Sequence, residues 1–412
     1  MEIDRSIKNF GYLISVQVIN YLFPLLSFGI TAHALGVDGL GKLALCQAII
    51  LYFQQFTDFG FNLTATRNVA LNKCDEQAIN ITYTTTIVSK VLFSLLSVIV
   101  IAAGCFLFDQ ALHEITVLLS ILMLGVVASV FYPVWLFQGL EKMQFVLYSN
   151  LVSKITILGM LAFFVQQPED LNIAAAAQSL SWVCVAAYAT WQVKKHRYAK
   201  FVSVSKILVL TTIKESFYIY LSVISTSFYS TFNVIFIGTI FNQQLVAYYS
   251  VADKIKGIFQ SLISAVCQAL YPKFCERNVD GTAGSNTRAH IFLFFLLGLI
   301  GTTSIQISAP YVIEMVAGKE MLPAVDILRI ISLVLPIVSV ASYLATLRIA
   351  ASGKTKLFFK IYSGGAIIHL IYVYPIAKLS GYAGVAACVV VTELVITAML
   401  FYASSKLVKD NG

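Results

Sequence analysis

Long apolar runs separated by short polar segments alternate along most of this chain. A helix rises about 1.5 Å per residue, so roughly 20 apolar residues are needed to cross the hydrocarbon core of a bilayer. The pattern therefore predicts an all-α integral membrane protein with about twelve transmembrane helices. The runs lie near residues 10–34, 42–62, 83–108, 114–137, 145–165, 171–193, 217–240, 245–271, 290–313, 323–347, 357–377 and 382–403.

Composition supports this prediction, because 58% of the residues are hydrophobic and only 12% are charged. Soluble domains carry roughly 25% charged residues, so this chain has too few polar side chains to cover a globule. The run 10–34 is long enough to span, and no small-residue cleavage site follows it; we expect it to remain as the first helix. The seven cysteines show no CxxC or metal-ligand spacing, so we expect no disulfide framework, metal site or cofactor.

The basic residues indicate the orientation of the helices. With the N-terminus inside, the cytoplasmic segments collect 20 of the 28 lysines and arginines, whereas the outer segments hold only Lys42, Lys319, Arg329 and Lys378. This bias obeys the positive-inside rule, and removing one span would invert every later loop. We therefore expect both termini in the cytoplasm, and we attribute the net charge of +8 to these loops rather than to a nucleic-acid partner.

A basic central segment divides the expected spans into six and six. It predicts an N-terminal six-helix lobe at 1–193, a basic cytoplasmic linker at 194–216 and a C-terminal six-helix lobe at 217–412. This linker is the longest inner connection and is too short to form a catalytic domain. We therefore expect any chemistry to take place within the membrane or at its surface.

A weak internal match supports two related halves. Residues 34–48 correspond to 241–255, and residues 136–149 correspond to 350–363. Six helices separate the matching segments, so the two halves would share one orientation in the membrane. Two such lobes around a central cavity are a common plan of transporters that work by alternating access.

Charged residues inside the spans are the candidate site. A charge at mid-bilayer costs at least about 2.5–3.5 kcal/mol on insertion scales, so it should face a cavity or a partner. Asp253, Lys254 and Lys256 in the eighth span lie roughly 12–16 Å from its outer end. Together with Lys154 in the fifth span, the lysines outnumber the nearby carboxylates, which favours a cationic cavity over a structural Asp253–Lys256 ion pair. Such a cavity suits an anionic substrate such as a diphosphate headgroup.

Two further basic residues are secondary candidates for the headgroup. We expect Lys90 to snorkel toward the inner surface, and Arg67 either to snorkel or to contact lipid phosphate.

For His369, a hydrogen-bonded contact between helices is a simpler interpretation than a proton relay. The candidates for ion coupling or charge balance are Asp253, Glu393, Asp58 and His369.

Polar and aromatic residues affect two details of the layout. Gln54 and Gln55 make the second span one of the two weakest. Trp135, Trp191 and Tyr198 stand at span ends, where aromatic side chains anchor helices at the membrane interface.

Five segments carry a resemblance to a known family. They are LGVDGLGK (35–42), DFGFNLTATR (58–67), PVWLFQGLEKM (133–143), YYSVADKIKG (248–257) and ALYPKF (269–274). In these segments the chain resembles the polysaccharide transporter family and, within it, the Wzx-type O-antigen flippases. That family belongs to the multidrug/oligosaccharidyl-lipid/polysaccharide exporter superfamily.

The resemblance implies two six-helix lobes and a flippase. Its substrate would be an undecaprenyl-pyrophosphate-linked oligosaccharide repeat unit, moved from the cytoplasmic to the periplasmic leaflet of a bacterial inner membrane and coupled to an ion gradient. The implied partners are this lipid-linked oligosaccharide, membrane lipid, the O-antigen polymerase and the chain-length regulator, with no nucleic acid.

Two alternative functions remain open. A drug or small-cation antiporter of related fold would favour a net acidic cavity, whereas lysines dominate here. A polysaccharide polymerase or glycosyltransferase would need a large periplasmic loop or paired acidic residues in the first outer loop. That loop carries the lone acidic residue Asp38.

Overall fold

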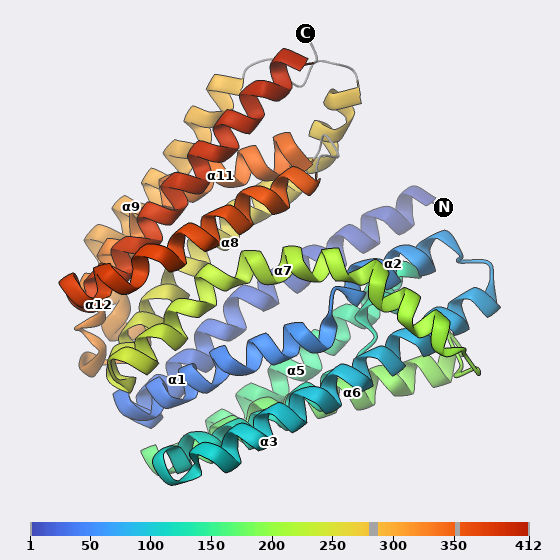
Figure 1. Ribbon diagram of the computed structural model, residues 1–412, viewed down its shortest axis with the longest axis horizontal. Coiled ribbons are helices and arrows are strands. Elements are labelled where there is room, and N and C mark those ends of the chain that lie inside the picture. The colour runs from blue at the N-terminus through green and yellow to red at the C-terminus, as the bar shows by residue number, and fades with distance from the viewer. Residues whose placement is uncertain (1, 280–286, 351–354, 411–412) are drawn as a thin grey trace. The chain divides into compact units, whose positions relative to one another are not determined.

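The computed structural model describes residues 2–279, 287–350 and 355–410 (Figure 1). Within these residues the regular structure is helical and contains no strand, which confirms the all-α prediction. One expected repeat segment, 350–363, extends into residues 351–354, outside the described ranges. The α-helices are α1 Glu2–Asp58, α2 Phe61–Leu71, α3 Glu76–Ser129, α4 Val134–Gly139, α5 Met143–Phe164, α6 Leu171–His196, α7 Lys206–Ile240, α8 Gln243–Val279, α9 Thr287–Ala317, α10 Ala324–Ser332, α11 Val334–Ser342 and α12 Thr355–Asp410. The shorter elements are the 3₁₀ turns η1 Pro168–Asp170 and η2 Lys319–Met321 and the π-helix η3 Tyr343–Ala350.

Nine helices in the described part of the chain are long and apolar enough to cross a membrane, so the chain is a multi-pass membrane protein. α8, which covers the expected eighth span, is not among the nine. The expected total of twelve stays a prediction. The nine are Leu26–Leu71, Glu76–Leu107, Glu114–Gly139, Met143–Phe164, Pro168–His196, Lys206–Ser225, Thr287–Ala317, Ala324–Ile349 and Phe359–Lys406.

Two of the long helices are interrupted by a sharp turn. α1 has 57 residues and α12 has 56, which would extend over about 85 Å if straight, far beyond one bilayer crossing. Gly36 in α1 and Gly381 in α12 take φ values of 64° and 61°, which glycine adopts without a Cβ clash. Figure 1 shows both helices as two arms that meet at such a turn. These turns separate the first span from the second and the eleventh from the twelfth, where the sequence pattern placed short outer connections.

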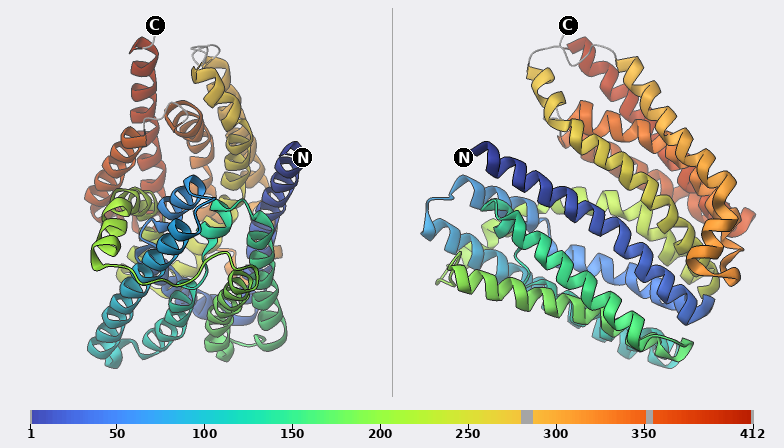
Figure 2. Two further views of the ribbon diagram at one scale, coloured as in Figure 1. Left: turned by 90° about the vertical axis from the view of Figure 1, so that its right-hand side faces the viewer. Right: turned by 180° about the vertical axis from the view of Figure 1, so that it is seen from behind.

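The chain divides into two compact units, Met1–Ile224 and Ser225–Gly412. In the first unit α5 and α6 pack together, α3 packs against α6, and α1 packs against both α3 and α5 (Figure 2). In the second unit α11 packs against α9 and α12, and α10 packs against α8. The expected lobe boundaries, and their arrangement around a central cavity, stay predictions.

Part of the expected linker is attached to the first unit. The Lys200 backbone N–H donates to Asn80 Oδ1 at 2.7 Å, and the Val202 N–H donates to Thr84 Oγ1 at 3.1 Å. α7 begins at Lys206, so the second half of the expected linker is already helical.

α3 shows how the polarity of a membrane helix is distributed. It buries Ser89, Ser94 and Ser97 in the unit and exposes Leu92 and Ile99. Leucine and isoleucine side chains meet lipid tails at no cost, whereas small polar side chains allow close helix packing and find hydrogen-bond partners inside. The exposed apolar side chains therefore form a lipid-facing surface.

In the core of the first unit, the position of Trp135 differs from the one expected from the sequence. Trp135, expected as an interfacial anchor, is fully buried with Leu136 and Phe137 in the short helix α4. Tyr83 lies 6.0 Å from the Trp135 ring, measured between ring centroids. Pro133 stands just before α4, so the chain turns there and carries Trp135 into the unit instead of to its edge.

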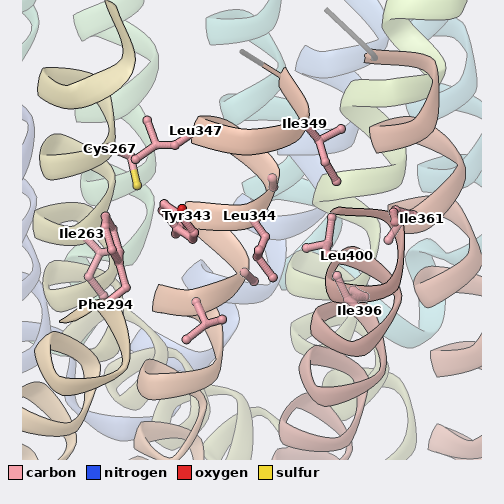
Figure 3. Close-up of a cluster of buried hydrophobic side chains, with 14 of the residues drawn as sticks. Ile263, Cys267, Phe294, Tyr343, Leu344, Leu347, Ile349, Ile361, Ile396 and Leu400 are labelled. Carbon is pink, nitrogen blue, oxygen red and sulfur yellow. The ribbon is translucent and has the colours of Figure 1, made fainter. Parts of the chain in front are cut away.

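The core of the second unit is built around the π-helix η3 (Figure 3). Tyr343, Leu344 and Leu347 point into a cluster that contains side chains from α8, α9 and both arms of α12. Tyr343 stacks on His290 with ring centroids 5.7 Å apart. π-helical turns are rare and widen the helix locally, so η3 can present several large side chains to one cluster.

Candidate functional site

The DFGF segment creates a break between two helices of the first unit. α1 ends at Asp58 and α2 begins at Phe61, and between them Phe59 and Gly60 take positive φ values of 41° and 76°. A Cβ on Gly60 would lie 2.9 Å from Ile219 Cγ2 and 3.0 Å from the Ser216 carbonyl oxygen of α7. The break therefore packs directly on the backbone of α7.

Asp58 forms an ion pair inside the first unit. Its Oδ1 lies 2.6 Å from Lys90 Nζ on α3. The Lys90 side chain is 2% exposed and that of Asp58 is 30% exposed, so the lysine is almost dry whereas the carboxylate keeps some contact with solvent or headgroups. The expected snorkelling of Lys90 is wrong, because its ammonium group is held inside the unit by a carboxylate from another helix.

Aromatic rings pack together next to this ion pair in the sequence, since Phe59 follows Asp58 and Phe93 lies three residues after Lys90. Phe59 stacks on Phe93 of α3 and on Tyr220 of α7, with ring centroids 4.4 and 4.5 Å apart. Thr64 and Ser216 share a hydrogen bond of 2.8 Å between their hydroxyl oxygens. The charged pair thus joins α1 to α3 beside the break that packs on α7, and the low exposure of Lys90 strengthens its attraction to Asp58.

The second unit contains the other predicted charge cluster. Lys256 Nζ on α8 donates to Asp253 Oδ1 at 2.7 Å, so the structural ion pair weighed against a cationic cavity does form. The Lys256 side chain is 11% exposed and that of Asp253 is 35% exposed. Lys254, which lies between them in the sequence, is exposed on another face of the helix.

His369 joins three helical segments of the second unit. It is fully buried on the first arm of α12, with Nε2 2.9 Å from Asn233 Oδ1 on α7 and Nδ1 2.6 Å from Thr392 Oγ1 on the second arm of α12. The expectation of a hydrogen-bonded helix contact is confirmed. Tyr372 Oη donates to the Cys388 carbonyl at 3.1 Å and also contacts the Thr392 hydroxyl.

The network around His369 can hold the ring in either protonation state. In the neutral ring Nε2–H donates to Asn233, and the Thr392 hydroxyl donates to Nδ1. In the cation Nδ1–H donates to Thr392 Oγ1. The Thr392 hydroxyl then donates to the Cys388 carbonyl oxygen, which lies 2.7 Å from Thr392 Oγ1. A single hydroxyl rotation therefore accommodates a proton without leaving a buried polar atom unpaired.

Glu393 lies beside this network and is buried, with 5% of its surface exposed. Tyr249 on α8 is also buried and forms a side-chain hydrogen bond with Asn233. The network thus links α7, α8 and both arms of α12. Sequence reasoning singled out His369 and Glu393 but missed Asn233, Tyr249 and Thr392. Uncharged polar residues are common in spans, so the positions alone carried no signal.

The remaining predicted site residues are more dispersed. Arg67 is exposed on α2, and Lys154 is half-buried on α5. The structure brings Asp58 together with Lys90 and brings Asp253 together with Lys256. It also gathers polar groups around His369. Roles in substrate binding or ion coupling stay predictions for all of these residues.

Comparison with known proteins identifies the family of this chain. The profile described as polysaccharide biosynthesis protein matches residues 6–277. A protein of Shigella dysenteriae described as "Putative O-antigen transporter" is 26% identical over 96% of this chain and 99% of its own length. A protein of Escherichia coli (strain K12) with the same description is 27% identical over 97% of both chains.

Solved structures show the same fold. An inward-facing multidrug resistance MATE family transporter of the MOP superfamily matches 96% of this chain and 95% of its own, with a TM-score of 0.75 and 16% identity. The lipid II flippase MurJ in an inward closed conformation matches 97% of this chain and 87% of its own, with a TM-score of 0.75 and 14% identity. The chain is thus a membrane transporter with several spanning helices. Because the profile of the polysaccharide biosynthesis protein family matches well over half of the chain, the protein belongs to that family.

Proposed function

We propose that this protein is a flippase for undecaprenyl-pyrophosphate-linked O-antigen repeat units. It would move them from the cytoplasmic to the periplasmic leaflet of the bacterial inner membrane, with both of its termini in the cytoplasm. The observation that carries the proposal is the similarity to O-antigen transporters along nearly the full length of the chain. Polar and charged side chains buried within spanning helices support it, because a transporter of a charged, sugar-bearing headgroup needs a hydrophilic route.

The lysines have different parts in this proposal. Lys154 is half-buried on α5 and Lys254 is exposed on α8, so both side chains can meet a ligand, and we assign them first to the diphosphate. Lys90 and Lys256 are each paired with an aspartate, so they contribute less net positive charge. Arg67, exposed on α2, would meet a phosphate at the cytoplasmic end of its span in this proposal.

Deletion of the gene in its source strain tests the proposal. Surface O-antigen should be lost while lipid-linked repeat units accumulate and stay inaccessible from the periplasm, because the unit cannot cross the bilayer unaided. Gel analysis of surface lipopolysaccharide and extraction of lipid-linked sugars would measure both. A plasmid copy should restore display. Undiminished surface O-antigen in the deletion strain would exclude the proposal.

A drug antiporter is the second candidate, favoured by the fold shared with a multidrug resistance transporter. Export of a cationic dye such as ethidium from the same strains would distinguish the two. We expect equal dye export with and without the protein. Loss of dye export together with normal O-antigen display would support the antiporter instead.

We propose that His369 couples transport to a proton gradient. The network around His369 satisfies both protonation states of the ring without leaving a buried polar atom unpaired. Two carboxylates lie near tyrosines of this network, Glu393 on α12 near Tyr372 and Asp253 on α8 near Tyr249.

A His369→Gln substitution tests this coupling, because glutamine can still hydrogen-bond to Asn233 but cannot exchange a proton. In proteoliposomes, an imposed pH gradient should accelerate flipping by the unaltered protein and have no effect on the variant. Flipping without a gradient should continue in both. If the variant still responds to the pH gradient, or if a sodium gradient alone drives the unaltered protein, His369 is not the coupling site.

A further inference from the structure

A small polar pocket lies within the first unit, between α1, α3 and α6. Gln47 and Gln54 are seven residues apart on α1, so they face the same side of the helix two turns apart. Gln178 and Trp182 approach from α6. Gly125 of α3 allows this approach, since a Cβ there would lie 3.2 Å from Trp182 Cδ1. The other lining residues are Ile50, Leu51, Leu122, Val126 and Ser179.

The residues that line the pocket lie inside spanning helices and not at their ends. Gln54 belongs to the Leu26–Leu71 span, Gln178 to the Pro168–His196 span and Leu122 to the Glu114–Gly139 span. Within the described residues, the amide groups of Gln47, Gln54 and Gln178 have no hydrogen-bond partner. All three residues are partly exposed, and all three line the pocket. An amide without a partner in an apolar medium costs free energy, so three of them around one pocket indicate a polar occupant.

The chemistry of the lining selects the class of occupant. Its residues include no charged side chain, so nothing there would neutralise a diphosphate. Glutamine amides both donate and accept hydrogen bonds, as sugar hydroxyls do. The Trp182 indole adds a flat apolar wall with a polar N–H, which suits the apolar face of a sugar ring. The cavity of about 100 Å³ is smaller than a whole hexose and admits its hydroxyl-bearing edge.

We propose that Gln47, Gln54, Gln178 and Trp182 form a subsite for the hydroxyl groups of one neutral sugar residue of the transported lipid-linked oligosaccharide. This inference rests on the proposed function. The subsite holds the sugar by amide hydrogen bonds, while lysines elsewhere meet the diphosphate. It separates recognition of the sugar from recognition of the headgroup.

A binding experiment with two probes tests the subsite. The probes are the complete lipid-linked repeat unit, extracted from cells that lack the transporter, and sugar-free undecaprenyl pyrophosphate. The variant is Gln47→Leu/Gln178→Leu, whose leucines are compatible with an apolar surrounding. We expect it to bind the complete unit about tenfold more weakly, from the loss of two hydrogen bonds. Binding of sugar-free undecaprenyl pyrophosphate should not change.

The control is Gln306→Leu in the second unit, which removes a glutamine that donates to the Arg329 carbonyl and to Ser332. It should bind both probes like the unaltered protein. If the double variant expresses poorly, Gln54→Leu and Trp182→Leu probe the same pocket, and Trp182→Phe should retain binding because it keeps a ring.

The outcomes separate this inference from the proposed function. Unaltered binding of the complete unit by the pocket variants overturns the subsite and leaves the flippase intact. Equal losses for both probes at an unchanged melting temperature also overturn it, because the pocket would then bind lipid or headgroup. If the unaltered protein binds neither probe, the proposed function itself is wrong.

Discussion

An Asp58→Asn substitution is expected to destabilise the protein by about 3–5 kcal/mol, because it leaves the Lys90 ammonium buried without its counter-charge. The Lys90 side chain is only 2% exposed, so water cannot replace the lost carboxylate. Lys90→Met should cost less, since the Asp58 carboxylate left behind is 30% exposed. The order of the two effects follows from this difference in exposure.

The double variant Asp58→Asn/Lys90→Met should recover most of the lost stability, because no unpaired charge remains. The melting temperature in detergent, followed by the loss of the monodisperse gel-filtration peak, would measure all three proteins. Glu76→Gln is the matched control. It breaks the Lys200–Glu76 pair, whose side chains are both more than half exposed, and such pairs contribute at most about 1 kcal/mol. Equal melting temperatures for Asp58→Asn and Glu76→Gln would contradict the dry environment of Lys90.

A Gly298→Ala substitution should have the second large effect. A Cβ on Gly298 would lie 2.5 Å from the Leu335 carbonyl oxygen, from Pro336 Cα and from Ser339 Oγ. Two of these atoms belong to the backbone of α11, so α9 and α11 would have to separate. Overpacking of this kind typically costs about 1–3 kcal/mol, more than the gain of up to about 1 kcal/mol from replacing a helical glycine.

Gly159→Ala provides the control for this prediction. Gly159 lies inside α5, and a Cβ there meets no atom within 4 Å among the described residues. Alanine should therefore be neutral or slightly stabilising at this position, through its higher helix propensity. Thermal unfolding of both variants in detergent gives the comparison. A Gly298→Ala protein as stable as Gly159→Ala would show that α9 and α11 pack less tightly than described.

The spans were predictable because lipid imposes a simple rule on the sequence. A segment that crosses the bilayer must satisfy its backbone internally and present about 20 apolar residues, so such a run is visible without any knowledge of its neighbours. The Glu114–Gly139 and Thr287–Ala317 spans lie where the pattern placed them. The turns at Gly36 and Gly381 fall between predicted spans for the same reason.

The partners of the buried groups were less predictable. In a soluble protein the polar face of a helix marks its exposed side, but here the buried side holds small polar side chains among apolar ones, so the pattern does not show which buried groups meet. Trp135 was expected at the interface because it stands at a span end, and it is buried; Lys90 was expected to snorkel, and it is paired. Neither result depends on the residue type alone.

The sequence by itself determined that this is a multi-spanning membrane protein, which charges lie within its spans, and which family it resembles. Only the tertiary structure decided that Asp58 pairs with Lys90, and that His369 meets Asn233 and Thr392, residues 136 and 23 positions away in the chain. The physical reason is the range of the interactions. Transfer from water to lipid acts on each helix separately, whereas ion pairs and hydrogen bonds act over about 3 Å and depend on which helices pack together.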